Sequence, residues 1–347
     1  MPIKVYSDRI ELGATVITAV PTGIRIGRSL STNTQITNTA SLGNFTARQL
    51  GYFSVFQGSV AGYTSGGFSP PYVNTIDRFP FSADTSVVDV GDLLGVNFNS
   101  VGQSSSVSGY VSGGYTPPFS NVIQKFPFSK NSNATDVGDL TQARRVGSGQ
   151  SSSSFGYSSG GGSPGVVNII DKFPFATDTN ATDVGDLSQA RSDAAGQSST
   201  THGYASGGSL NPPTVNTIDK FPFVADTNAT DIGDLSVSRN ASGGQSSTTH
   251  GYTSGGYSTS PAAANVNTID KFPFATDTNA SDVGDLTQVR RSSAGQSSTT
   301  HGYTSGGIIP TPAYVNTIDR FPFSADTNAT DVNDLTQVRQ TQSGQQF

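Results

Sequence analysis

Apolar and polar residues alternate over short stretches of this chain, and clusters of Gly, Pro, Ser and Asn interrupt the alternation. In residues 191–238, the segment VNTIDKFPF alternates Val, Ile and Phe with polar residues, and TDIGDLSVS follows with Ile and Leu. Apolar residues at the i, i+3, i+4, i+7 spacing of an amphipathic helix do not occur there. With the small-residue segment AGQSSTT and the aromatic segment HGYASGG, this pattern predicts four short strands and almost no helix.

The same four-segment pattern recurs along the chain. A Gly-Tyr pair followed closely by Gly-Gly marks each copy, and the spacings between successive Gly-Tyr pairs are 47, 47, 47, 48 and 51 residues. A period of this size is typical of repeat architectures. Four antiparallel strands in about 50 residues are typical of a β-propeller blade, a twisted sheet that packs against its neighbours in a ring. We therefore expect an all-β fold, with residues 1–347 forming a single β-propeller domain.

Each copy also carries glycines and phenylalanines at fixed places. Glycine permits a positive φ or a close approach of another backbone, and the Gly-Gly pairs form the structural signature of the repeat: Gly66, Gly67, Gly113, Gly114, Gly160, Gly161, Gly207, Gly208, Gly255, Gly256, Gly306 and Gly307. We expect the Phe pairs, such as Phe221 and Phe223, between neighbouring blades, where each ring removes roughly 150–250 Å² from water.

The unit resembles the kelch repeat of β-propellers. Arg191, Gly196-Gln197, Tyr204, Gly207-Gly208 and the Phe pair at 221 and 223 follow one another in the kelch order. The resemblance covers residues 48–339 and implies a propeller. Kelch-type propellers serve as scaffolds, binders and occasionally enzymes, so the resemblance does not specify the function.

Two positions depart from the kelch pattern. Gln stands where kelch repeats carry His, and the chain has no Trp, so Ile232 or Leu235 must fill the place of the fourth-strand Trp.

The two ends of the chain bear on the number of blades. Six kelch-like repeats occupy residues 48–339, NTASLGNFTAR (38–48) copies the end of a unit, and RQTQSGQQF (339–347) copies a beginning. A seven-bladed ring uses both copies, with strands from residues 1–47 completing the last blade together with 340–347. The alternative is six blades plus an N-terminal β-hairpin extension.

The composition excludes several classes of protein. Cysteine is absent, so the chain has no disulfide, thiolate metal site or cysteine nucleophile. No run approaches 18 apolar residues, and the N-terminus lacks the apolar core of a secretory signal, so we expect no membrane insertion. The net charge is −6 and Lys and Arg are scattered, so we expect no nucleic-acid partner.

Histidine recurs at one position of three successive units, as His202, His250 and His301. Equivalent positions of a ring share radius and height, so three imidazoles facing a channel would suggest a metal site. Adjacent blades hold such side chains apart, and a His that only caps a strand next to Gly-Tyr is the favoured interpretation.

The segment DTNATDVGD (178–186) recurs almost unchanged and offers oxygen donors. It lacks the spacing and the bidentate Glu of a calcium loop, and Asp and Asn at tight turns commonly bond their own backbone. We therefore predict no metal and no cofactor.

Nothing in the sequence predicts catalysis. A Ser/His/Asp set needs one unrepeated constellation, whereas these loops are short and repeated. The Asp219-Lys220 pair, which recurs in most units, is interpreted as an exposed charge pair contributing about 0–1 kcal/mol. We expect a protein that is not an enzyme.

The segments after each Gly-Gly pair vary most between units. They are rich in proline, which lowers the entropy that a loop loses on docking, and a ring places them on one rim, where propellers carry binding sites. Neutral drift of the loops is the alternative. The aromatic candidates for partner binding on this rim are Tyr72, Tyr115, Phe119, Tyr257 and Tyr314.

The whole sequence is similar to propeller proteins encoded by marine bacteriophages, especially those of cyanobacteria. The near-identical segments NTIDKFPFATDTNATDVGDLT and GQSSTTHGYTSGG carry this similarity, and the opening MPIKVYSDRIELGATVITAVPTGIRIG looks like the β-rich start of phage tail proteins. The resemblance implies a non-enzymatic structural component of a virion, on its tail, a fibre or another surface appendage, with other virion proteins as partners. The alternatives are a lectin-like propeller that binds a host glycan or receptor through repeated, multivalent sites, and a capsid decoration protein.

Overall fold

The structure is a computed structural model. It describes the backbone of residues 3–5, 9–12, 15–20 and 23–28, and residues 57–311 and 313–347 in full. The chain divides into two units, Met1–Phe53 and Ser54–Phe347. All regular elements in the described part of the chain are β-strands, as the sequence pattern predicts, and none of these residues forms a helix able to cross a membrane.

The N-terminal unit contains one antiparallel sheet of four strands in chain order. The strands are β1 (Ile3–Val5), β2 (Arg9–Leu12), β3 (Thr15–Val20) and β4 (Gly23–Arg28).

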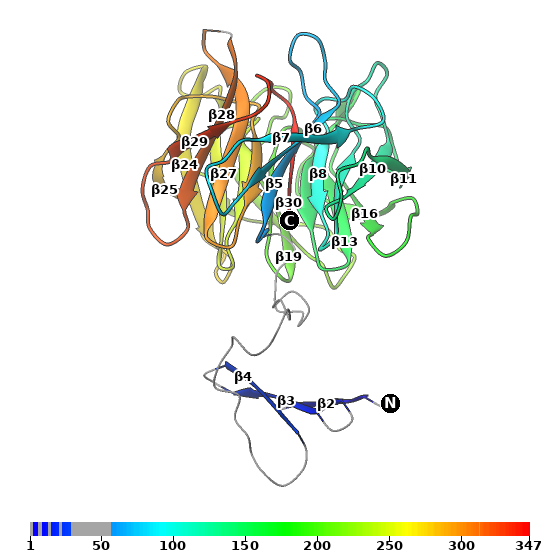
Figure 1. Cartoon of the computed structure of the whole chain (residues 1–347). Helices are drawn as coiled ribbons and strands as arrows, with labels where there is room; N and C mark the ends of the chain where they lie inside the picture. Colours follow the sequence, from blue (N-terminus) through cyan, green and yellow to red (C-terminus); the bar gives the residue numbers. More distant parts are fainter. Residues whose placement is uncertain (1–2, 6–8, 13–14, 21–22, 29–56, 312) are drawn as a thin grey trace. The chain divides into compact units, whose positions relative to one another are not determined.

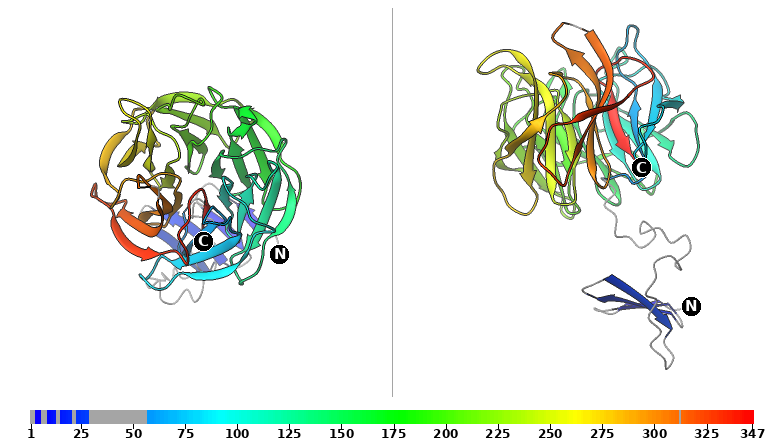
Figure 2. Two further views of the ribbon diagram at one scale, coloured as in Figure 1. Left: turned by 90° about the horizontal axis from the view of Figure 1, so that it is seen from above. Right: turned by 60° about the vertical axis from the view of Figure 1, so that its left-hand side comes forward.

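The C-terminal unit is a propeller of six four-stranded antiparallel blades around one axis (Figures 1 and 2). From the innermost strand outward, blade 1 contains β30 (Ser343–Gln346), β5 (Ala61–Ser65), β6 (Thr75–Pro80) and β7 (Val88–Asp92). Blade 2 contains β8 (Val101–Ser104), β9 (Ser108–Ser112), β10 (Val122–Pro127) and β11 (Thr135–Asp139). Blade 3 contains β12 (Ser148–Ser151), β13 (Phe155–Ser159), β16 (Ile169–Pro174) and β17 (Thr182–Asp186), with the small hairpin β14 (Gly162–Ser163) and β15 (Gly165–Val166) between its second and third strands.

The last three blades repeat this order. Blade 4 contains β18 (Ala195–Ser198), β19 (His202–Ser206), β20 (Thr217–Pro222) and β21 (Thr230–Asp234). Blade 5 contains β22 (Gly243–Ser246), β23 (His250–Ser258), β24 (Ala264–Pro273) and β25 (Ser281–Asp285). Blade 6 contains β26 (Ala294–Ser297), β27 (His301–Ile309), β28 (Ala313–Pro322) and β29 (Thr330–Asp334).

The prediction of seven blades is wrong, and the six-bladed alternative is confirmed. The C-terminal strand β30 pairs with β5, with Ser343 opposite Ser65 and Gln345 opposite Tyr63, so it is the innermost strand of blade 1 (Figure 1). The C-terminal copy of a unit's beginning therefore completes the first unit instead of starting a seventh blade. The N-terminal strands pair only with one another among the described strands, in a four-stranded sheet rather than a hairpin. The N-terminal copy at 38–48 lies outside the described residues.

Close approach of the six innermost strands requires glycine at one position of each. A Cβ atom on any of these glycines would lie 2.1–2.3 Å from the carbonyl oxygen of the equivalent glycine in the neighbouring blade, and the set forms a closed ring: Gly102, Gly149, Gly196, Gly244, Gly295 and Gly344. Real Cβ atoms do not approach an oxygen this closely, so any other residue would push two blades apart.

A second ring, made of backbone hydrogen bonds, surrounds the axis where each linker enters an innermost strand. Its members have φ between 53° and 58°, and each N–H donates to the carbonyl oxygen of the preceding member over 2.7–2.9 Å: Asn99, Val146, Asp193, Ala241, Ser292 and Thr341. Left-handed backbone is uncommon outside glycine, so the closed ring of bonds holds these residues in it.

Glutamine and aromatic side chains connect neighbouring blades. The Gln of each GQ pair donates from Nε2 to the carbonyl oxygen of the repeat Tyr in the next blade, as Gln150 does to Tyr204 over 2.9 Å. The Phe pairs fill the gap between blades, as predicted. Phe221 and Phe223 pack on Tyr157 of the preceding blade with centroid distances of 5.5 and 4.8 Å.

The Gly-Gly pairs have the predicted positive φ values. The first glycine of each pair has φ of 62–66° and the second 110–117°. The second N–H donates to a carbonyl oxygen in the middle of the linker that leads to the next blade, as Gly161 does to Arg191 over 2.9 Å, and in blade 1 the acceptor is the counterpart residue Asn97.

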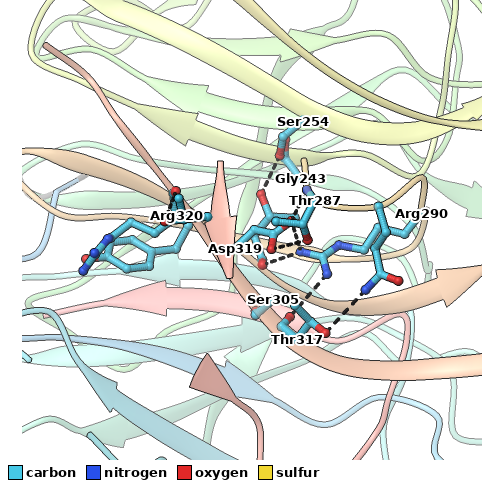
Figure 3. A network of polar contacts seen from close by, with 12 residues as sticks. Gly243, Ser254, Thr287, Arg290, Ser305, Thr317, Asp319 and Arg320 are labelled. Carbon is cyan, nitrogen blue, oxygen red and sulfur yellow. Dashed lines mark hydrogen bonds and ion pairs between the residues drawn. The ribbon is translucent and has the colours of Figure 1, made fainter. Parts of the chain in front are cut away.

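A buried ion pair joins the linker to the third strand in five blades. Figure 3 shows one of them: the Arg290 guanidinium lies 3.2 Å from Asp319 Oδ2, and Thr287 donates its hydroxyl to Asp319 Oδ1 over 2.7 Å. Burial lowers the pKa of Arg290, and Asp319 opposes that shift. The other four pairs are Arg144–Asp171, Arg191–Asp219, Arg239–Asp270 and Arg339–Asp77.

The interpretation of Asp219 and Lys220 as an exposed charge pair is wrong. Asp219 is fully buried and pairs with Arg191, and Lys220 bonds Asp277 of the next blade over 2.7 Å. Adjacent residues of a strand point to opposite faces, so the two side chains cannot pair with each other.

Blade 2 replaces the buried ion pair by neutral groups. Asn97 stands at the arginine position and donates to the Gly113 carbonyl oxygen over 2.9 Å, while Gln124 stands at the aspartate position and accepts the Leu94 N–H over 2.7 Å. Both side chains are buried. Among the repeats of this chain, the arginine and the aspartate are therefore replaced together by neutral residues.

This exchange predicts strong coupling between the two charges. Arg290→Asn or Asp319→Gln alone leaves one buried charge without its partner and should cost about 3–5 kcal/mol of unfolding free energy. The double variant, which carries the residues of blade 2, should cost at least about 2 kcal/mol less than the two single changes added together. Urea unfolding of the four proteins measures the coupling.

The exposed pair Lys271–Asp326, 2.8 Å apart, is the matched control, and its coupling should be below about 1 kcal/mol. Additive effects of the two buried changes would show that the pair is not coupled.

Candidate functional site

One end of the propeller carries the variable loops. The segment between the second and third strands of each blade meets the linker that enters the blade, through bridges such as Phe98–Tyr115 and Asn240–Tyr257. We call this end, which is uppermost in Figure 1, the loop face.

Six aromatic rings form a continuous row on the loop face. Their centroids are 4.5–5.3 Å apart, and the order along the row is Tyr314, Phe68, Tyr72, Phe98, Tyr115 and Phe119. Tyr72 and Phe98 are stacked with an interplanar angle of 9°, and Phe98 meets Tyr115 edge to face at 88°. The row crosses blades 6, 1 and 2, so residues far apart in sequence make one surface. We call these six residues the aromatic row.

Four of the five aromatic candidates from the sequence lie in this row. The fifth, Tyr257, packs instead under Arg291, whose guanidinium carbon is 4.7 Å from the ring centroid. Sequence reasoning missed Phe68 and Phe98, although Phe68 belongs to the variable segment FSPPY. Comparison of the linkers could have identified Phe98. Its linker, LLGVNFNS (93–100), carries apolar residues where the next linker, LTQARRVG (140–147), carries polar and charged ones.

The linker that carries Phe98 also exposes aliphatic side chains. Leu94 is 57% exposed and Val96 42% exposed, and Tyr72 in the row is 38% exposed. At the position of Leu94, the other five linkers carry a Ser or Thr that bonds the buried aspartate. Adjacent exposed apolar side chains commonly mark interaction sites.

Charge is scarce on the loop face. The segments from each Gly-Gly pair to the third strand contain no charged residue. Arg145 lies over the last rings of the row, with its guanidinium carbon 5.5 Å from the Tyr115 centroid and 5.4 Å from that of Phe119. No carboxylate in the described part of the chain forms an ion pair with Arg145, whereas the third-strand lysines Lys125, Lys172, Lys220 and Lys271 are all paired.

A polar cavity of about 160 Å³ lies on the axis, lined by the innermost strands and the linker residues that precede them. Its one carboxylate is Asp193, which accepts a hydrogen bond from Ser192 Oγ over 3.0 Å. Partial burial raises the pKa of Asp193 to about 6, against smaller lowering effects of Ser192 and Arg145.

The structure does not arrange the three repeated histidines as metal ligands. His202, His250 and His301 each place Nδ1 2.8 Å from the hydroxyl of the preceding Thr. Burial lowers the pKa of each imidazole, and a nearby Lys or Arg adds to the effect. No three His, Asp or Glu side chains among the described residues gather as metal ligands.

The oxygen donors of DTNATDVGD act as turn and interblade groups. Asp183 accepts the Gly185 N–H over 3.1 Å, and Asn180 accepts the Asp139 N–H of the preceding blade over 3.1 Å. Asp178 pairs with Lys125 of that blade. These contacts account for the recurrence of the segment without a calcium ion.

Comparison with models of known protein families gives no match, and a search of curated proteins gives none either.

The raised pKa of Asp193 predicts that replacing this residue stabilises the fold by an amount that depends on pH. Asp193→Asn carries the residue that blade 2 has at this position, Asn99, with φ of 56°. The carboxylate is costly to the folded state only when ionised, so the variant should be more stable by about 1 kcal/mol at pH 7.5, a figure discounted for partial exposure. The gain should shrink as pH falls through about 6 and vanish below the ordinary aspartate pKa. Urea unfolding across pH measures it, and an equal gain at pH 4 and 7.5 would contradict this assignment.

Proposed function

We propose that this protein is a non-enzymatic structural component of a bacteriophage virion. It acts as a rigid scaffold on the tail, a fibre or another tail appendage, and holds neighbouring virion proteins against its loop face. The observation that carries the proposal is the aromatic row on a face almost free of charge, set on a ring whose blades are closely tied. A resemblance of the repeats to phage propellers, seen in the sequence alone, is the ground for placing the protein in a virion.

Several features suit a scaffold. Rings of glycine contacts, backbone hydrogen bonds and glutamine side chains connect all six blades, so loops that project from them are held in fixed relative positions. Proline in these loops restricts the backbone and lowers the entropy lost on docking.

The lectin-like alternative with equal sites on every blade is less favoured. The repeat tyrosines that would supply such sites, including Tyr110, Tyr157 and Tyr204, are buried between blades. A host receptor or glycan would instead have to use the unequal loop face.

Labelling of purified virions tests the proposal. Virions of the phage that carries the gene are stained with a gold-coupled antibody raised against residues 57–347, and the denatured particles are analysed by mass spectrometry. We expect the chain among the virion proteins and gold at one position of the tail.

Absence of the chain from the denatured particles would overturn the proposal, whether or not epitopes are hidden in intact ones. Gold spread over the head would replace the tail role by capsid decoration, and gold only at fibre tips would replace the scaffold role by receptor binding.

A further inference from the structure

The aromatic row crosses the junction between blades 1 and 2, where the repeat's polar side-chain interactions are fewest. Between blades 1 and 2 the buried Arg–Asp pair is replaced by Asn97 and Gln124, and the Ser or Thr hydroxyl by Leu94. The outer Lys–Asp pair is lost as well, because Asn131 stands where the next blade has Asp178. At this junction, side chains that connect blades in the other repeats are replaced, and at Leu94 the replacement is an apolar side chain that faces solvent.

The composition of this surface is that of the centre of a protein interface. Such centres are depleted of charge and enriched in aromatic residues and Arg, and Tyr and Arg anchors dominate binding energy. The row offers Tyr72, Tyr115 and Phe119, with Arg145 over its last two rings. Ser, Asn and Gly make up much of the rest of the loops, as in protein-binding loops that combine rigid aromatic anchors with adaptable polar groups.

The charge at the end of the row indicates what the partner must supply. Arg145 rests on two aromatic faces, which hold a guanidinium weakly, and no carboxylate pairs with it in the described part of the chain. A guanidinium binds a carboxylate through two parallel hydrogen bonds. A protein whose net charge is −6 repels acidic partners at long range, so Arg145, on a face with few charges, marks where one acidic group can dock.

The row is a chain of rings in which each ring contacts the next. Its five ring-to-ring steps are each 4.5–5.3 Å, so the row is at most roughly 25 Å long, about seven residues of extended chain. A run of successive contacts of up to this length fits a peptide segment better than a compact ligand.

We propose that the aromatic row, with Leu94, Val96 and Arg145, is the docking site for an extended segment of a neighbouring protein. The segment places apolar or aromatic side chains along the row and a carboxylate on Arg145. The inference rests on the proposed scaffold function and adds to it the position of the site and the chemistry of the partner.

Peptide selection followed by repeat-matched variants tests this proposal. A displayed library of random twelve-residue peptides is selected on the immobilised full chain, and enriched peptides are measured by fluorescence anisotropy. Tyr115→Ser introduces the residue that blade 4 carries at this position, Ser209, and Arg145→Ser introduces that of Ser192. Tyr257→Ser makes the same change outside the row and is the control. Thermal unfolding checks that each variant is folded.

We expect enriched peptides to combine an aromatic residue or proline with one acidic residue. Their Kd should rise at least about tenfold in Tyr115→Ser and Arg145→Ser, and stay within about twofold in Tyr257→Ser. Changing the acidic residue of the peptide to its amide should weaken binding to the unchanged protein and have no further effect in Arg145→Ser.

Failure to enrich any peptide, or peptides that bind all variants equally, would overturn the proposal. Binding of arrayed oligosaccharides that depends on Tyr115 would overturn it in favour of a sugar. The selection uses no virion, so its result is independent of where the chain lies in a particle.

Discussion

Close packing of six innermost strands around one axis is the constraint on which the rest of this structure depends. The strands approach until the glycine of one blade meets the carbonyl oxygen of the next, and no residue with a Cβ fits there. That approach brings Gln Nε2 within hydrogen-bond distance of the next blade and closes the backbone ring at the linkers. The larger side chains are thereby kept to wider radii, where Phe and Tyr fill the gaps between blades.

The repeats act as an internal set of substitutions, and their exceptions separate structure from function. Five blades keep the buried Arg–Asp pair, and blade 2 changes both partners at once, as expected when a lone buried charge is far more costly than a neutral pair. The exception lies where exposed Leu94 and the row of aromatic rings occur. A surface that departs from its repeat and becomes apolar no longer supplies those contacts between blades, and the proposed docking site is argued from that departure.

Much of the fold follows from the sequence because strand spacing, the Gly-Gly pairs and the Phe pairs obey local rules. The number of blades does not, because the copy of a unit's beginning at 339–347 can either start a seventh blade or complete the first, and sequence similarity does not state which strand it pairs with. Asp219 was misjudged because its neighbour Lys220 suggested a charge pair, whereas its true partner is Arg191 in the preceding linker.

The candidate site was partly predictable for a similar reason. Loops between fixed strands share one rim, which placed Tyr72 and Tyr115 correctly on one face. Phe98 belongs to a linker, and its role emerges only when linkers of different units are compared and the blades are closed.

Closure of the ring at six by the C-terminal strand is the central claim, and a cross-link tests it most directly. The chain has no cysteine, so Ser65→Cys and Ser343→Cys introduce a single possible disulfide between directly opposed residues of β5 and β30, and opposed residues of an antiparallel pair lie within disulfide range. Mild oxidation should give an intramolecular disulfide that raises Tm, whereas a control pair at 206 and 343 should give none. If the thiols at 65 and 343 remain free after oxidation of the folded protein, or form a disulfide only between chains, the six-bladed closure is contradicted.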